Sequence, residues 1–153
     1  MANAEVVDFE TRRFMWGTDI SERRLLHLAL RVEDLDRSLR FYVDVLGMKL
    51  KEIIDIHPAG ALVAFVSYGD DYRDGGFIEL ASYPAESGPY THGTGFHHIS
   101  IGVADVREVI SQLEEMGVEV TVQPTEYLGK GPFMAYVKDP DGYSVEFIQT
   151  VAN

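Results

Sequence analysis

The chain carries the same pattern twice, and this internal duplication constrains its fold more than any other feature. Residues 25–35 and 95–106 each place a histidine beside an apolar run that leads to an aspartate. Each half then closes on a short apolar stretch with one glutamate inside it, Glu79 in the first half and Glu146 in the second. A repeat of about 70 residues is too long for a solenoid unit. It therefore predicts a single module that has been duplicated.

The first half has the pattern of one strand, one helix and three further strands. An apolar run predicts the first strand, and Asp34 can cap a helix whose apolar residues recur at helical spacing as far as Gly47. Turn-forming residues separate the three apolar runs that follow. The predicted strands are 25–32, 48–56, 61–68 and 76–82.

The second half repeats this order. Asp105 can cap a helix that stops at Gly117, and residues 139–142 (Asp-Pro-Asp-Gly) form a strong hairpin signal between the last two strands. The strands are expected at 96–103, near 118–122, at 132–138 and at 143–149. Both halves therefore have the order βαβββ.

These patterns predict an α+β fold made of two βαβββ modules, each forming a curved, half-open mixed sheet. Residues 1–22 are mostly polar and are expected to form an arm that docks on the body or on a partner subunit, with disorder of residues 1–10 as the alternative. The predicted division is an N-terminal arm at 1–22, a first module at 23–84, a linker at 85–94 and a second module at 95–153.

The composition excludes several classes of function. With 13 basic and 25 acidic residues, the formal charge is −12, and nucleic acid is a poor partner because binding phosphates needs clustered cations. The absence of cysteine excludes disulfides, cysteine-ligated zinc and thiol nucleophiles. No run of about 18 apolar residues predicts a membrane span, and no signal peptide is evident. We therefore expect a cytoplasmic enzyme that acts on a small molecule, without a membrane or nucleic-acid partner.

Histidine and glutamate recur at equivalent places of the two halves, and strand alternation gives them a common direction. Glu79 lies between Ile78 and Leu80, so its side chain points away from the face that its apolar neighbours present to a helix layer. A buried carboxylate without a partner is costly, so this face must supply a cation or water. Each residue alone is most simply a solvent-facing strand residue, but their joint recurrence favours a divalent metal site. The predicted ligands are His27, Glu79, His98 and Glu146.

Two imidazoles and two carboxylates suit Zn²⁺, Ni²⁺, Co²⁺, Mn²⁺ or Fe²⁺ better than Ca²⁺ or Mg²⁺, which prefer oxygen ligands alone. Two anionic ligands make a divalent site formally neutral. One or two positions stay open for water or substrate oxygens, as in a catalytic site.

Four segments of the chain carry a family resemblance. They read LLHLALRVEDLDRSLRFYVDVLGMKL (25–50), FIEL (77–80), GTGFHHI (93–99) and DPDGYSVE (139–146). Together they resemble bacterial glyoxalase I (lactoylglutathione lyase), within the vicinal oxygen chelate superfamily, and the resemblance runs from about residue 24 to 149.

The resemblance implies a metal-dependent enzyme that isomerises the hemithioacetal of methylglyoxal and glutathione to S-lactoylglutathione through an enediolate. It implies one divalent ion per site (Ni²⁺, Zn²⁺ or Co²⁺ first, then Mn²⁺ or Fe²⁺) on the four ligands already named. It also implies a homodimer with its sites between subunits. A glutamate shuttles the proton, with Glu146 the first choice and Glu79 the second. Arg31 matches the arginine that meets a glutathione carboxylate.

The sequence departs from the glyoxalase I pattern at three places. Tyr83 stands where that family commonly has an asparagine that helps to hold glutathione. The loop 124–131 does not match the family's lysine–glycine segment cleanly, which makes Lys130 a candidate substrate contact. The arm 1–22 is additional to the short bacterial form.

Other members of the superfamily remain alternatives. An epimerase of the methylmalonyl-CoA type shares the proton-transfer chemistry and the segment 93–99, but it more often has glutamine in place of Glu79. An extradiol dioxygenase needs two histidines and one carboxylate, so a fourth ligand disfavours it. A metal-free small-molecule binding protein would lack the ligands altogether.

Two smaller expectations concern aromatic residues near this site. His97, next to a predicted ligand, is expected to point to the opposite face as a packed or hydrogen-bonded residue. Four aromatic residues are expected in the core, some of them lining an apolar pocket. They are Phe65, Phe77, Phe133 and Tyr136.

Overall fold

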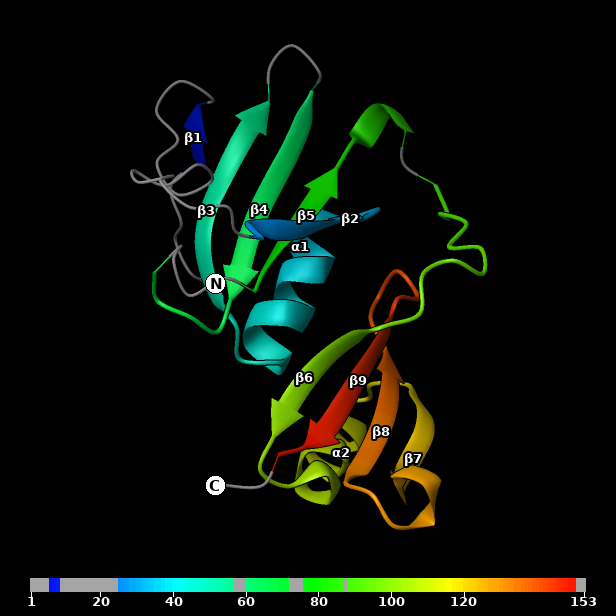
Figure 1. Cartoon of the computed structure of the whole chain (residues 1–153). Helices are drawn as coiled ribbons and strands as arrows, with labels where there is room; N and C mark the ends of the chain where they lie inside the picture. The colour runs from blue at the N-terminus through cyan, green and yellow to red at the C-terminus, as the bar shows by residue number, and fades with distance from the viewer. Residues whose placement is uncertain (1–5, 9–24, 57–59, 72–75, 87, 151–153) are drawn as a thin grey trace. The chain divides into compact units, whose positions relative to one another are not determined.

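The structure, a computed structural model, describes residues 6–8, 25–56, 60–71, 76–86 and 88–150. The chain separates into two compact units, Met1–Tyr90 and Thr91–Asn153, each built around its own sheet (Figure 1). Both sheets are mixed and each is accompanied by one helical segment, which confirms the predicted α+β class. The predicted bounds of arm, modules and linker stay predictions.

The first unit contains the predicted βαβββ order after a short additional strand. Its sheet has the strand order β1-β3-β4-β5-β2, in which β2 runs parallel to β5 and β1 parallel to β3. The elements are β1 Val6–Asp8, β2 His27–Arg31, α1 Leu35–Leu39, a π-helical turn Arg40–Val45, β3 Lys49–Ile56, β4 Ala61–Ser67, β5 Phe77–Ser82 and a 3-10 turn Pro84–Glu86.

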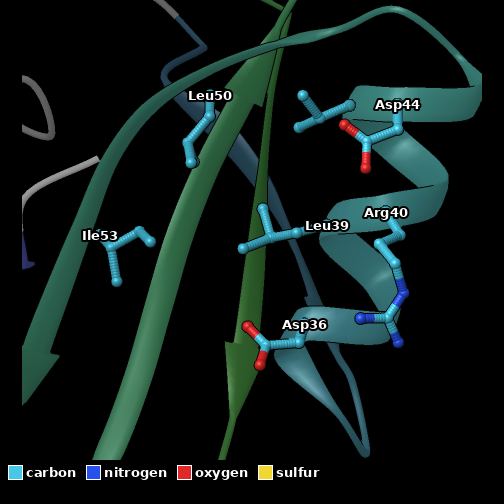
Figure 2. Close-up of a pocket in the computed structure, with 7 residues that line it drawn as sticks. Asp36, Leu39, Arg40, Asp44, Leu50 and Ile53 are labelled. Atoms are coloured by element: carbon cyan, nitrogen blue, oxygen red, sulfur yellow. The ribbon is translucent and has the colours of Figure 1, made fainter. Parts of the chain in front are cut away.

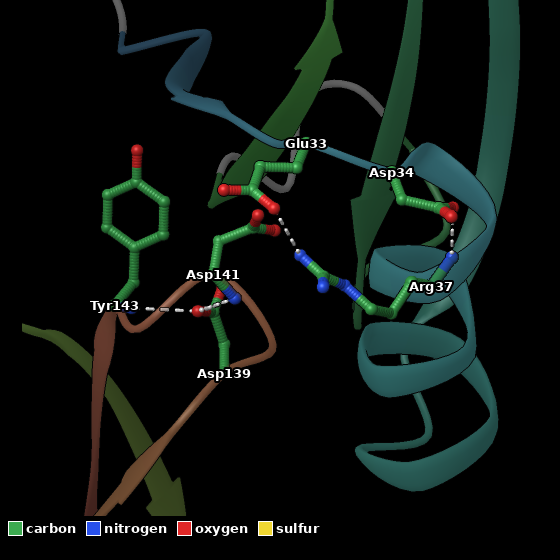
Figure 3. A network of polar contacts seen from close by, with 6 residues as sticks. All are labelled: Glu33, Asp34, Arg37, Asp139, Asp141 and Tyr143. Atoms are coloured by element: carbon green, nitrogen blue, oxygen red, sulfur yellow. Dashed lines mark hydrogen bonds and ion pairs between the residues drawn. The ribbon is translucent and has the colours of Figure 1, made fainter. Parts of the chain in front are cut away.

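The helix of the first unit begins where the sequence predicts it. The side chain of Asp34 accepts a 2.9 Å hydrogen bond from the backbone N–H of Arg37, which caps α1 (Figure 3). The predicted continuous α-helix changes to a π-helical turn, because the N–H of Leu46 bonds the carbonyl of Phe41 five residues earlier. The segment stops at Gly47, whose φ of +73° favours glycine.

The described part of the predicted arm joins the first sheet. Val6–Asp8 form β1, which pairs in parallel with β3 so that Val6 lies opposite Ile53. The other residues of the arm 1–22 lie outside the described residues.

The second unit repeats the βαβββ order, with strand order β6-β9-β8-β7. Its helix is capped by Asp105, which accepts from the N–H groups of Arg107 and Glu108, and it packs against β7, β8 and β9. The elements are β6 Ile99–Val103, α2 Val106–Glu115, β7 Val120–Glu126, a 3-10 turn Tyr127–Gly129, β8 Phe133–Lys138 and β9 Ser144–Gln149.

The predicted hairpin turn at 139–142 sets the register of β8 against β9. One carboxylate oxygen of the buried Asp139 accepts hydrogen bonds of 2.9 Å and 2.8 Å from the N–H groups of Asp141 and Tyr143 (Figure 3). The turn places Tyr136 directly opposite Glu146.

The first sheet has two chemically different faces. Its helix-covered face buries residues such as Leu80, and α1 contacts β4 and β5. Because alternate residues point to opposite faces, Glu79 belongs to the other face, together with an apolar cluster. That cluster consists of Ile54, Val63, Phe65 and Ala81, with Ile56 and Tyr83 packed against it.

Candidate metal centre

The first predicted histidine and glutamate lie next to each other. β2 and β5 are parallel neighbours, and Ala29, two residues after His27, lies opposite Glu79. The His27 Nε2 is 3.1 Å from Glu79 Oε2. The imidazole also packs edge-on against Phe65, with ring centres 5.4 Å apart. Sheet pairing therefore assembles this pair from residues that are distant in the sequence.

The second histidine and glutamate form an equivalent pair in the second unit. His98 lies just before β6, and its Nε2 is 3.3 Å from Glu146 Oε2 in the neighbouring β9. The ring of Tyr136 packs edge-on against His98 with centres 5.6 Å apart, as Phe65 does against His27. The two pairs therefore match in both distance and packing.

Glu146 has two further partners. The Ser100 hydroxyl donates a 2.6 Å hydrogen bond to Oε2, and the Tyr136 hydroxyl donates a 2.7 Å hydrogen bond to Oε1. The corresponding cross-strand neighbours of Glu79 are Ala29 and Phe65, which have no hydroxyl groups. The two carboxylates thus have different surroundings at equivalent places.

These surroundings move the pKa values of the two carboxyl groups in opposite directions. Burial raises the pKa of Glu79 above its ordinary value, and the nearby His27 offsets this only in part. Burial alone would also raise the pKa of Glu146. Hydrogen bonds from Ser100 and Tyr136, with the charges of the neighbouring histidines, outweigh burial and leave this pKa below its ordinary value.

Tyr136 responds to the same contact. Burial and the hydrogen bond to the Glu146 carboxylate raise the pKa of its hydroxyl to about 12. The hydroxyl therefore stays protonated, and a donor to Glu146, across the physiological pH range. From the sequence, Tyr136 was predicted only as an aromatic core residue, so this polar role was missed.

The donor atoms fit a divalent metal ion. Two ligands at about 2.1 Å from one ion, with angles between 90° and 109°, lie roughly 3.0–3.4 Å apart. The nitrogen–oxygen distances of 3.1 Å and 3.3 Å fall in this range. All four side chains are mostly buried, the two glutamates being only 13% and 11% exposed. Each pair is thus suited to supply half of a His₂Glu₂ shell.

Within the described residues, no group of three or more histidine, aspartate and glutamate side chains is arranged to hold a metal ion. The structure brings His27 to Glu79 and His98 to Glu146, each pair inside its own unit. The union of the two pairs in one site stays a prediction.

The predicted substrate residues Arg31 and Tyr83 lie together at the end of β2. The guanidinium carbon of Arg31 is 4.6 Å from the ring centre of Tyr83 and 5.4 Å from that of Tyr90. Its Nη2 lies 2.5 Å from Glu86 Oε2. Arg31 shares a strand face with His27, from which it is separated by four residues, or about 13 Å.

Lys130 lies elsewhere in the second unit. It is exposed, it follows the 3-10 turn between β7 and β8, and it lines a shallow hollow with Phe133 and Gln149. Neither His98 nor Glu146 lines this hollow. A role for Lys130 in substrate binding stays a prediction.

A second hollow, in the first unit, also lies away from the candidate centre. It is formed between the α1 segment and β3, and it is lined by Leu39, Arg40 and Asp44 on one side and by Leu50 and Ile53 on the other (Figure 2). Ile53 lies opposite Ala64, which lies opposite Leu80, so the hollow is on the helix-covered face. None of the predicted site residues lines it.

His97 does not point away from the site as predicted. Its ring packs edge-on against His98, and the two Nδ1 atoms lie 2.6 Å apart in a hydrogen bond. Strand alternation fails here because β6 begins only at Ile99. The expected hydrogen-bonded state of His97 is confirmed, but its direction was wrong.

Sequence patterns contain signals for two of the residues that were missed. Ser100 follows His98 by two residues, and Tyr136 and Glu146 each lie five residues from Asp141 in the hairpin turn. Both positions follow from strand parity and register. Glu86 and Tyr90 have no such signal, because a loop brings them to Arg31.

The family of the chain follows from comparison with known proteins. A family model described as the Glyoxalase/Bleomycin resistance protein/Dioxygenase superfamily matches residues 24–147. The chain belongs to this superfamily. A probable lactoylglutathione lyase of Vibrio parahaemolyticus is 41% identical over 130 residues, which cover 85% of this chain and 93% of the relative.

Other superfamily members that resemble this chain differ in length. A solved glyoxalase I from Leishmania major, described as trypanothione-dependent, is 35% identical with a TM-score of 0.74, covering 84% of this chain and 87% of that one. The lactoylglutathione lyase of Arabidopsis thaliana is 39% identical over 127 residues, covering 83% of this chain. This chain spans only 44% of the length of that plant relative.

Membership of the glyoxalase/dioxygenase superfamily supports a divalent metal as the cofactor of such a site. In the described part of the chain, no helix is long and apolar enough to cross a membrane. The cytoplasmic location stays a prediction.

Proposed function

We propose that this protein is a lactoylglutathione lyase of the glyoxalase I type, converting the methylglyoxal–glutathione hemithioacetal to S-lactoylglutathione. The observation that carries the proposal is the pair of equivalent histidine–glutamate contacts, one in each unit, at 3.1 Å and 3.3 Å. The relatives named lactoylglutathione lyase support the choice of reaction.

The proposed metal ligands complete one another as two halves of a shell. We assign one divalent ion, Ni²⁺, Zn²⁺ or Co²⁺, to each set formed by both pairs, with Mn²⁺ or Fe²⁺ as further candidates. The set is completed either within one chain or between the subunits of a homodimer. The ligands are His27, Glu79, His98 and Glu146.

A divalent ion in this place would polarise the substrate carbonyl and acidify the adjacent C–H group. The carboxylates of Glu79 and Glu146 supply the base that takes the proton from one carbon and returns it to the next. Both carboxylates are mostly buried, so water is kept from competing for that proton.

The first sheet offers a place for the thiol carrier of the substrate. Arg31 lies about 13 Å along the strand from His27, on the same face, and its guanidinium can form a bidentate contact with a carboxylate. Tyr83 packs against both Arg31 and the apolar cluster. We assign these two residues to binding of the carrier's anionic end, with Lys130 as a further candidate contact.

The test is an assay of S-lactoylglutathione formation from methylglyoxal and glutathione, with metal-free protein reloaded separately with Ni²⁺, Zn²⁺ or Co²⁺. We expect turnover with at least one ion and one bound metal per ligand set. Sedimentation of the reloaded protein determines whether the active form is a dimer. If the protein binds these metals stoichiometrically but turns over the substrate with none of them, the lyase proposal is wrong. Another proton-transfer reaction, such as that of a methylmalonyl-CoA-type epimerase, would then be the better candidate.

A further inference from the structure

The second ring nitrogen of His98 has a partner of its own. Nε2 of His98 lies 3.3 Å from Glu146 Oε2, so it is the atom proposed to bind the metal. Nδ1 of the same ring lies 2.6 Å from Nδ1 of His97, in a hydrogen bond between two edge-on rings whose centres are 4.8 Å apart. Both nitrogens of this imidazole are therefore engaged, one at the proposed site and one by the neighbouring residue.

The first module has no counterpart of His97. Leu26 precedes His27 as His97 precedes His98, and an apolar side chain cannot bond to an imidazole nitrogen. Among the described residues, the polar side-chain partner of His27 is Glu79. The two proposed ligand histidines are thus alike at Nε2 and different at Nδ1.

Strand pairing leaves His98 with less support than His27. His27 is the first residue of β2 and lies opposite Phe77 in β5. The pairing of β6 with β9 begins only at Ile99, one residue after His98. Aromatic packing is the same in both modules, with ring planes at 69° in each. The hydrogen bond to His97 therefore restrains a ring that lies just outside the strand pairing.

The chemistry of imidazole sets the direction of this hydrogen bond in a metal-bound site. A neutral imidazole carries one N–H group, and the nitrogen that binds a metal cannot carry it. If Nε2 of His98 binds the ion, the proton is on Nδ1, and that nitrogen can only donate. Nδ1 of His97 is then the acceptor, and the proton of His97 is on its Nε2. A metal-binding histidine commonly donates its second N–H to a fixed acceptor, which sets its tautomer and ring orientation.

We propose that His97 is a positioning residue for the metal, which accepts the Nδ1–H of His98 and so holds that ring with Nε2 free to bind the ion. The inference rests on the metal site of the proposed lyase. It goes beyond that site, because a set of four ligands does not require a histidine before His98. Both residues belong to the second unit, so the role is the same whether one chain or two subunits complete the set.

The first experiment observes the hydrogen bond directly, by NMR of the full chain with ¹⁵N-labelled histidine and bound Zn²⁺. We expect a proton on Nδ1 of His98 and a scalar coupling between this nitrogen and Nδ1 of His97, because such couplings pass through N–H···N hydrogen bonds. His97→Ala identifies the His97 signals and should remove the coupling. Absence of the coupling in the Zn²⁺-loaded wild type would overturn the proposal.

The second experiment measures metal retention, by loading the full chain with Co²⁺ and adding excess chelator. His97→Ala removes the acceptor and should release Co²⁺ roughly 10- to 100-fold faster, in line with the loss of metal affinity that is typical when the partner of a ligand histidine is removed. The Co²⁺ absorption spectrum should also change, because the ring of His98 is no longer held in one orientation.

Asparagine and glutamine provide a matched pair of variants at this position. The side-chain oxygen of asparagine is as many bonds from the backbone as Nδ1 of histidine, whereas that of glutamine is one bond further, like Nε2. His97→Asn should therefore retain slow Co²⁺ release, and His97→Gln should release it as fast as His97→Ala. The side chain of His97 is exposed, so all three variants should fold, and metal-free melting temperatures verify this.

The measurements separate the role of His97 from the proposed function. Co²⁺ release at the wild-type rate from folded His97→Ala would overturn the role of His97. Metal-loaded wild type without lyase turnover would instead overturn the proposed function. The coupling and the release rates would still decide the role of His97, because neither measurement requires turnover.

Discussion

Arg31, the residue proposed to meet the carrier's carboxylate, already has a carboxylate partner in Glu86, with Nη2 and Oε2 2.5 Å apart. Both side chains are exposed, and two tyrosine rings flank the guanidinium. An anionic carrier must therefore compete with Glu86 for Arg31. This competition has a measurable effect on substrate affinity.

Replacing Glu86 with glutamine should lower KM for the glutathione adduct and leave kcat unchanged. Because exposed ion pairs contribute about 0.2–1 kcal/mol, we expect a decrease of roughly 1.4- to 5-fold. Arg31→Lys should raise KM, because lysine lacks the planar fork. Glu115→Gln makes the same charge change on the exposed surface of α2 and is the matched control. If Glu86→Gln and Glu115→Gln changed KM equally, the net charge of the protein, and not the contact between Glu86 and Arg31, would be the cause.

The two proposed glutamate ligands should titrate in a fixed order in metal-free protein. The pKa of Glu79 is raised, chiefly by burial, and that of Glu146 is lowered, because hydrogen bonds outweigh burial. Glu79 should therefore take up its proton at a higher pH than Glu146. Carboxyl-carbon NMR can follow both titrations, and the variants Glu79→Gln and Glu146→Gln assign the two glutamate signals. If Glu146 took up its proton at a higher pH than Glu79, the directions of the two pKa shifts would be wrong.

The same shifts predict opposite effects on stability. The raised pKa of Glu79 favours the folded state at low pH, and this contribution is lost as pH rises through the folded pKa. The lowered pKa of Glu146 contributes stability above the unfolded pKa, which is lost as pH falls through the folded value. At neutral pH, Glu79→Gln should therefore raise the free energy of unfolding of metal-free protein, and Glu146→Gln should lower it. Urea denaturation at several pH values measures both.

The hydroxyl group of Tyr136 should titrate near pH 12 in metal-free protein, about two units above an ordinary tyrosine. Glu146→Gln removes the charged acceptor and should lower this pKa, although burial, the larger cause, remains. Ultraviolet difference spectra against Tyr136→Phe isolate the signal from the other tyrosines. If Glu146→Gln left the Tyr136 pKa unchanged, the hydrogen bond would be absent in solution.

Sequence periodicity predicted the repeated βαβββ order because both modules bury alternating apolar residues on one sheet face. The duplication predicted that His27, Glu79, His98 and Glu146 share one metal ion; the structure brings them together as two pairs, and the shared site stays a prediction. Periodicity could not predict the direction of His97, because the residue lies before its strand and alternation does not apply.

Features that depend on loop conformation were also missed. Glu86 reaches Arg31 through the 3-10 turn Pro84–Glu86, and no spacing rule predicts that contact. The π-helical turn after α1 was also missed, because the capping residue Asp34 and the stop at Gly47 predict the ends of the helical segment and not whether its hydrogen bonds span four or five residues. Ser100 and Tyr136 were within reach, since both follow from pairing once the hairpin register is known.

The turn that sets this register should be a stability determinant. The buried Asp139 side chain accepts from the backbone N–H groups of Asp141 and Tyr143, so Asp139→Ala would leave two donors without their partner. We expect the free energy of unfolding to fall by about 1–3 kcal/mol, as measured by urea denaturation of metal-free protein. Asp139→Asn keeps an oxygen acceptor and should lose less.

Because the turn aligns Tyr136 with Glu146, Asp139→Ala should also release Co²⁺ faster than Asp139→Asn does. If the two variants released Co²⁺ at the same rate although they differ in stability, the turn would not be needed to position Glu146.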